Sequence, residues 1–166
     1  IGGNGNDTFN FAENATISGV IDGGQGSDRL NYAADTRDIT VRRLAPAIMS
    51  ATGIGGEAAN IESIVGSHSG DDTFIGPDDA TGIYDFLITG NNSGYATNWS
   101  EYGAVTFSSF ENLTGGEGYD RFRFYYSASV SGAIDGGGYH KDYISYRRYN
   151  TGVEIDLFAG TATAVA

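Results

Sequence analysis

The feature that most constrains this chain is a long internal repeat, whose copies start at residues 2 and 115. Residues 2–24 align without gaps on residues 115–137, and 13 of the 23 paired positions are identical. The match resumes after one inserted residue, where DRLNY (28–32) corresponds to DYISY (142–146). A repeat of this kind predicts an architecture in which equivalent units stack on one another.

We therefore interpret residues 1–166 as a single segment of a longer repeat protein. The first copy of the long repeat occupies residues 2–114, and residues 115–166 form a partial second copy. The match also extends to a short alternating stretch, since ITV (39–41) corresponds to VEI (153–155).

A shorter motif recurs inside the long repeat: a Gly-rich loop, an aspartate, and an apolar residue two positions later. Its copies carry Asp7, Asp28, Asp72, Asp120 and Asp142. The separations of 21, 44, 48 and 22 residues lie close to multiples of 22. This register predicts about 22 residues per turn of a solenoid. Weak additional copies near 52–59 and 88–96 would fill the two larger gaps.

Short strands are the expected secondary structure. Gly accounts for 26 residues, Pro for only 2, and aromatic residues for 13% of the chain, a composition typical of strands joined by tight turns. Apolar residues alternate after the loops and are expected to point inward: these pairs are Phe9/Phe11, Leu30/Tyr32, Phe122/Phe124 and Ile144/Tyr146. The sequence therefore predicts an all-β fold, a parallel β-solenoid of the β-helix or β-roll type.

Charge and composition exclude several classes of protein. The formal net charge is −12 with a single lysine, Lys141, which argues against nucleic-acid partners. The chain has no cysteine, so disulfides and cysteine-type zinc sites are excluded. No apolar run is long enough to predict a membrane span. The acidic balance favours a secreted or cell-surface protein.

The loops GGNGNDTF (2–9), GGQGSDRL (23–30) and GGEGYDRF (115–122) resemble the haemolysin-type, or repeats-in-toxin, calcium-binding nonapeptide. The resemblance implies a parallel β-roll that folds outside the cell and binds calcium through loop aspartates and carbonyls. Carried over onto this sequence, the implied calcium-site residues are Asp7, Asp28, Asp120, Asp142, Gly3, Gly5, Gly24, Gly26, Gly116 and Gly118. The competing interpretation is that each aspartate only accepts hydrogen bonds from its own turn.

Two functional hypotheses remain. The first is a non-enzymatic structural or adhesive segment with no catalytic residues, whose partners are neighbouring repeats or copies of itself stacked end to end. The second is a carbohydrate-active β-helix, either a lyase-like or epimerase-like enzyme or a module that binds surface polysaccharide. Its candidate groove would be lined by Tyr139, His140, Lys141, Arg147 and Arg148. The polar stretch 89–103, which includes Trp99, is either a flat sugar-binding surface or an ordinary loop.

Overall fold

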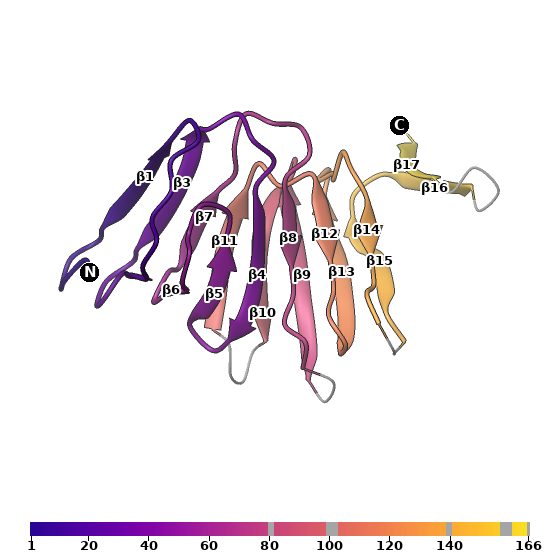
Figure 1. The fold of residues 1–166 in the computed structure, drawn as a ribbon. Coiled ribbons are helices and arrows are strands. Elements are labelled where there is room, and N and C mark those ends of the chain that lie inside the picture. The colour runs from indigo at the N-terminus through magenta and orange to yellow at the C-terminus, as the bar shows by residue number, and fades with distance from the viewer. Residues whose placement is uncertain (80–81, 99–102, 139–140, 157–160, 166) are drawn as a thin grey trace.

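The computed structural model describes residues 1–79, 82–98, 103–138, 141–156 and 161–165 (Figure 1). Within these ranges the chain is all-β and contains no helix. Its strands form two large mixed sheets, in which most neighbouring strands are parallel, and one small two-stranded sheet. The predicted all-β class is therefore confirmed.

The larger sheet has eight strands in the order β1-β3-β7-β11-β10-β9-β13-β15. In that order the strands are β1 (Thr8–Ala12), β3 (Arg29–Ala34), β7 (Ser63–Val65), β11 (Gly103–Ser108), β10 (Ser93–Asn98), β9 (Ile83–Gly90), β13 (Tyr119–Tyr126) and β15 (Tyr143–Tyr149). Only the β9-β10-β11 meander is antiparallel.

The second sheet has seven strands in the order β14-β12-β8-β4-β5-β6-β2. These are β14 (Ile134–Asp135), β12 (Asn112–Thr114), β8 (Thr73–Ile75), β4 (Thr40–Ala45), β5 (Ile48–Ala51), β6 (Ala58–Ala59) and β2 (Ile21–Asp22). Here too the antiparallel part is a meander, β4-β5-β6. Figure 1 shows the chain advancing along both sheets from the N-terminus at one end towards the C-terminus at the other.

The parallel pairs show where the short period holds and where it is wrong. Phe9 pairs with Leu30 and Phe122 pairs with Ile144, each with the equivalent residue of the next copy of the motif. By contrast, Leu30 pairs next with Ile64, which is about one and a half periods further along the chain. The additional copies expected near 52–59 and 88–96 do not carry the motif aspartate: the first is the glycine-containing connection from β5 to β6, and the second is the hairpin from β9 to β10. They fall in the two antiparallel meanders, whose strands occupy positions in the sheets without adding a motif.

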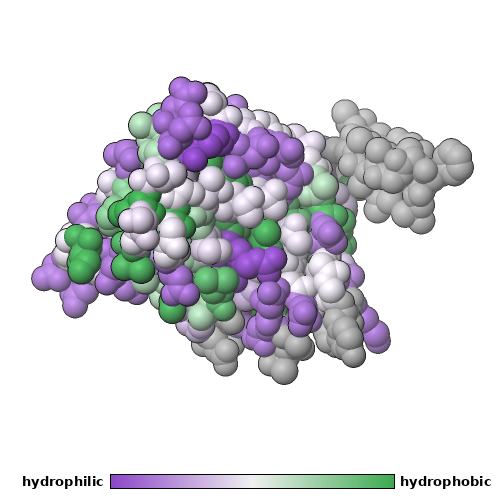
Figure 2. All heavy atoms as spheres, viewed as in Figure 1, coloured by the Kyte–Doolittle hydropathy of each residue, from purple (hydrophilic) through white to green (hydrophobic). Residues whose placement is uncertain are grey.

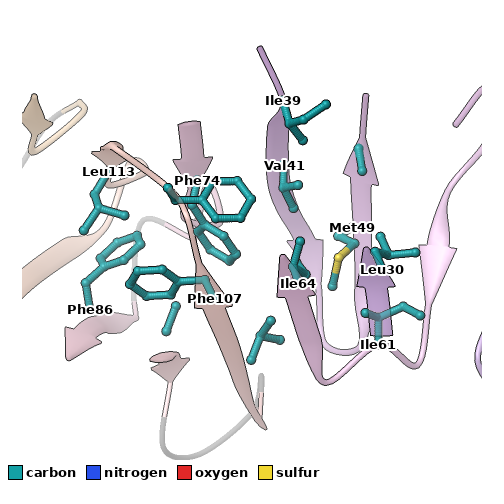
Figure 3. Close-up of a cluster of buried hydrophobic side chains, with 14 of the residues drawn as sticks. Leu30, Ile39, Val41, Met49, Ile61, Ile64, Phe74, Phe86, Phe107 and Leu113 are labelled. Carbon is teal, nitrogen blue, oxygen red and sulfur yellow. The ribbon is translucent and has the colours of Figure 1, made fainter. Parts of the chain in front are cut away.

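The two large sheets share one hydrophobic core. Phe74 on the seven-stranded sheet packs edge-on against Phe86 on the eight-stranded sheet, with ring centroids 5.9 Å apart. Phe107 and Leu113 are also enclosed there, and Figure 3 shows these side chains lying together. Burial of large apolar side chains is the main favourable term in folding. The outer face viewed in Figure 2 mixes hydrophilic and hydrophobic residues.

Most of the predicted inward positions are buried, and their rings stack between neighbouring strands. Phe11 stacks on Tyr32 with centroids 4.4 Å apart, and Phe124 stacks on Tyr146 at 4.7 Å. Stacking at this distance follows from parallel strands about 4.8 Å apart carrying aromatic rings at matched positions. Ile144 shares the inward face of its register partner Phe122, but it is 47% exposed because β15 is the outermost described strand of its sheet.

The remaining strands, β16 (Gly152–Asp156) and β17 (Thr161–Val165), pair antiparallel as a separate two-stranded sheet. The sequence match between 39–41 and 153–155 is reflected in part, since β4 also starts an antiparallel hairpin. However, β4 additionally pairs with β8, whereas β16 pairs only with β17 among the described strands.

Candidate metal-binding loops

Four of the predicted aspartates lie at the N-terminal ends of strands in the eight-stranded sheet. Asp7, Asp28 and Asp142 directly precede β1, β3 and β15, and Asp120 is the second residue of β13. They form two neighbouring pairs. The backbone N–H of Asp7 donates to Asp28 Oδ1 at 2.7 Å, and that of Asp120 donates to Asp142 Oδ1 at 2.9 Å. In each pair, one carboxylate therefore satisfies a backbone donor on the adjacent strand, which links neighbouring loops directly.

Asp72 does not belong to this series, because it precedes β8 of the seven-stranded sheet. It makes the same kind of contact there, accepting a hydrogen bond from the Ile39 N–H at 2.7 Å. The motif letters do not reveal which sheet a loop leads into, so the series of five aspartates could not separate Asp72 from the other four.

Two glutamates extend these series and were missed by the motif pattern. Glu62 Oε2 accepts from the Asp28 N–H at 2.8 Å, and Glu111 Oε2 accepts from the Asp72 N–H at 3.0 Å. Neither glutamate belongs to a Gly-Gly-x-Gly-x-Asp motif. The signal that would have found them is the simpler pattern of an acid two residues before a buried apolar residue, as in Glu62-Ser-Ile64.

The first glycine of each loop is packed against the adjacent pass of the chain and against the loop's own aspartate. A Cβ built on Gly23 would lie 2.1 Å from the Asn60 carbonyl oxygen, and those on Gly66 and Gly115 would meet the carbonyl oxygens of Ser109 and Gly136 at 2.0 and 2.2 Å. A Cβ built on Gly23, Gly66, Gly115 or Gly136 would lie 2.5 Å from Oδ2 of Asp28, Asp72, Asp120 or Asp142, respectively. No real Cβ tolerates that distance without a shift of its surroundings. The spacing of glycine and aspartate in the motif is therefore a packing constraint in its own right.

The remaining loop glycines bring neighbouring loops into backbone contact. The Gly3 carbonyl accepts from the Gln25 N–H at 2.7 Å, and the Gly116 carbonyl accepts from the Gly138 N–H at 2.9 Å. Gly24 and Gly26 have φ values of 96° and 141°, which favour glycine, and lie against the carbonyls of Gly3 and Gly5. Gly118 similarly faces the backbone carbonyl of Asp79.

Three buried carboxylate oxygens have no hydrogen-bond partner among the described residues: Asp7 Oδ2, Asp28 Oδ2 and Asp120 Oδ1. Burial raises the pKa of Asp120 to about 6, an effect that the Gly116 N–H opposes and the neighbouring Asp142 reinforces. Burial also raises the pKa of Asp72. Unpartnered buried oxygens of this kind need either a proton or a cation.

The loops offer a calcium ion few side-chain ligands. In the part of the chain that the structure describes, no three His, Cys, Asp or Glu side chains converge as a metal-binding group. Calcium takes six to eight oxygen ligands. A calcium ion at these loops would therefore combine one or two carboxylates with backbone carbonyls, and the Gly3 and Gly116 carbonyls already accept hydrogen bonds.

The residues of the carbohydrate hypothesis are only partly brought together. Arg147 and Arg148 line one cavity over β13 and β15, but Lys141 does not line it. Tyr139 and His140 lie outside the described residues, as does Trp99. The stretch that contains Trp99 is not simply a long loop, because most of it forms part of strands β9 and β10.

Comparison of the sequence with protein-family models and with curated proteins, and of the fold with solved structures, found no match. Among the described residues there is also no helix of the length and apolarity needed to cross a membrane. Function is therefore inferred from the geometry of this chain.

Proposed function

We propose that this chain is a structural segment of a parallel β-solenoid, which lengthens a secreted or cell-surface protein by stacking strands. The observation that carries the proposal is the register of the parallel pairs. Strands from successive passes of the chain lie side by side with equivalent apolar residues matched, as Leu30 is with Ile64 and Ile64 with Phe107. Such stacking leaves each unit in contact only with its neighbours.

The long repeat supports the proposal because it supplies both sheets equally. Residues 2–114 contribute six strands to the eight-stranded sheet and six to the seven-stranded sheet. The second copy then begins with β13 and β14, which correspond in sequence to β1 and β2. A further copy can therefore be added without leaving either sheet short of a strand.

The test is to insert one more copy of residues 2–114 between Thr114 and Gly115. The second new junction reproduces the existing pairing of β9 with β13. At the first junction β1 takes the place of β13, so the inserted copy carries Thr8→Arg and Asn10→Arg to keep the arginine partners of the buried Asp85. Six further strands at a spacing of about 4.8 Å should lengthen the particle by about 29 Å. Small-angle X-ray scattering should show this increase in maximum dimension with an unchanged cross-section. Two globular bodies joined by a flexible connection would contradict the proposal.

A role for calcium in this function remains a separate proposal. The unpartnered oxygens of Asp7, Asp28 and Asp120 support it, whereas the direct hydrogen bonds between loops provide a stack without an ion. If calcium contributes, its chelation should lower the melting temperature by several degrees, because a ligand that binds only the folded state stabilises it. A melting curve that is identical in excess chelator and in millimolar calcium would remove calcium from the account.

A further inference from the structure

The two copies of the long repeat agree on their inward faces and differ on their outward faces. The inward residues of β1 and β13 are the same, with Phe9 and Phe11 corresponding to Phe122 and Phe124. The outward positions are not. In the first copy the set consists of small or neutral residues: Thr8, Asn10, Ala12, Ala33 and Ala34. In the second copy the corresponding residues are Arg121, Arg123, Tyr125, Arg147 and Arg148.

This substituted face is hollowed. A cavity of about 360 Å³ lies over β13 and β15, at the lower end of the ~300–1,000 Å³ range of small-ligand sites. Its lining includes Arg123, Arg147 and Arg148, together with Tyr125, Tyr143 and Ser145. We call this cavity the arginine groove.

Two of the three groove arginines lie apart from the acidic residues of the described chain. The third, Arg123, shares the fully buried Asp85 with Arg121, and its Nη1 lies 3.7 Å from Asp85 Oδ1. No carboxylate among the described residues lies within 4.0 Å of the Arg147 or Arg148 guanidinium. The groove is therefore a local concentration of positive charge on a chain whose net charge is −12.

Aromatic rings complete the groove. The Arg148 guanidinium lies over the Tyr125 ring, 5.5 Å from its centroid, so a cation–π contact positions it. Tyr143 is 39% exposed, and its ring lies 5.8 Å from that of Tyr119. Arginine forks bind carboxylates and sulfates with paired hydrogen bonds, and exposed tyrosine rings supply flat apolar surfaces.

We propose that the arginine groove binds an acidic polysaccharide, with its arginines on carboxylate groups and its tyrosines against sugar rings. A nucleic acid fits less well, because a protein with a net charge of −12 repels a duplex that carries one phosphate charge per ~1.7 Å. A polyuronate carries about one charge per sugar, so its charge density is lower and it is repelled less. Binding at the arginine groove does not require that the whole chain act as a structural segment.

The experiment measures binding of polygalacturonate to the full chain by isothermal titration calorimetry. The groove variants are Arg123→Asn, Arg147→Ala and Arg148→Ala, in which each new residue is the one that the first copy carries at the equivalent position. Each should weaken binding about 10- to 150-fold, the loss expected when a charge-assisted hydrogen bond is removed. The matched control is Arg29→Ala on β3, an exposed arginine outside the groove, which should change affinity less than about twofold. Circular dichroism of each variant establishes that it is folded.

Neutral dextran and inorganic sulfate serve as comparison ligands, and a DNA duplex as a competing polymer. The proposal predicts binding of polygalacturonate that weakens with salt, with no binding of dextran. It is overturned if the folded groove variants bind polygalacturonate as well as the unmodified chain does. It is equally overturned if DNA binds more tightly, or if sulfate at the same charge concentration displaces the polymer completely. The last result would make the groove a simple anion site.

Discussion

Raising the pH should destabilise this protein through Asp120, whose side chain is 1% exposed and has one oxygen without a partner among the described residues. Burial raises its pKa in the folded state from 3.8 to about 6. Between pH 3.8 and about 6, Asp120 is mostly protonated in the folded state and mostly ionised in the unfolded state. The stabilisation is therefore complete below about pH 3.8 and is lost as the pH rises through about 6.

The magnitude follows from the shift. Each pKa unit corresponds to about 1.4 kcal/mol, so a shift of roughly two units gives about 3 kcal/mol of unfolding free energy in all. Asp72, whose pKa is also raised, acts in the same direction. The ion pair with Arg37 lowers the pKa of Asp35, so Asp35 stabilises the fold above its unfolded pKa and loses that effect only in stronger acid. The range from about pH 4.5 to about 7.5 therefore isolates the raised pKa values, and about two thirds of the Asp120 effect falls within it.

The assay is urea denaturation at a series of pH values and constant ionic strength, with chelator present, for the unmodified chain and Asp120→Asn. Asparagine still accepts a hydrogen bond from the Gly116 N–H but cannot ionise. Relative to the unmodified chain, the variant should gain about 2 kcal/mol between about pH 4.5 and about 7.5. A difference between the two proteins that is independent of pH would refute the reasoning. If calcium binds Asp120, adding it should abolish most of the pH dependence, because a cation stabilises the ionised form.

Two further predictions concern packing. Gly23→Ala should destabilise the fold by about 1–3 kcal/mol, because its Cβ would meet the Asn60 carbonyl oxygen at 2.1 Å and Asp28 Oδ2 at 2.5 Å. Gly5→Ala, where a Cβ meets nothing within 4 Å, should change stability by less than about 0.5 kcal/mol, and equal effects at the two sites would contradict the packing role of the first glycine. Phe86→Ala should cost about 3–5 kcal/mol because the ring is fully buried and stacks on its neighbours. The comparison change Ile144→Ala, at an exposed apolar position, should lower the free energy of unfolding by well under half as much as Phe86→Ala in the same urea titration.

The pairing of strands could be predicted where the chain repeats its own residues closely. The neighbouring pairs Asp7/Asp28 and Asp120/Asp142 follow from consecutive copies of the short motif, and the structure places them side by side. The alternation after each aspartate also gave the correct inward face for Phe11, Tyr32 and Phe124. Period-2 patterns survive in sequence because each inward residue must fill the core.

The two antiparallel meanders could not be predicted from the period. An antiparallel strand occupies the same spacing in a sheet as a parallel one, so β5 and β10 fill a position without the Gly-Gly-x-Gly-x-Asp motif. A gap of about two periods is therefore ambiguous between a weak copy and an inserted hairpin. The roles of Glu62 and Glu111 were hidden for a related reason, since they perform the hydrogen bonding of the motif aspartates without the motif glycines.

The central claim is that strands from successive passes of the chain lie parallel and in register, and disulfide cross-linking tests it directly because the chain has no cysteine of its own. Asn10 and Asn31 are register partners on β1 and β3, with their side chains hydrogen-bonded at 2.7 Å. The double variant Asn10→Cys/Asn31→Cys should form an intramolecular disulfide under mild oxidation, since adjacent strands lie within the ~4.4–6.8 Å that a disulfide spans. The control, Asn10→Cys/Val65→Cys, joins positions two strands apart and should remain reduced. Equal oxidation of both variants, or cross-linking of the control alone, would contradict the account.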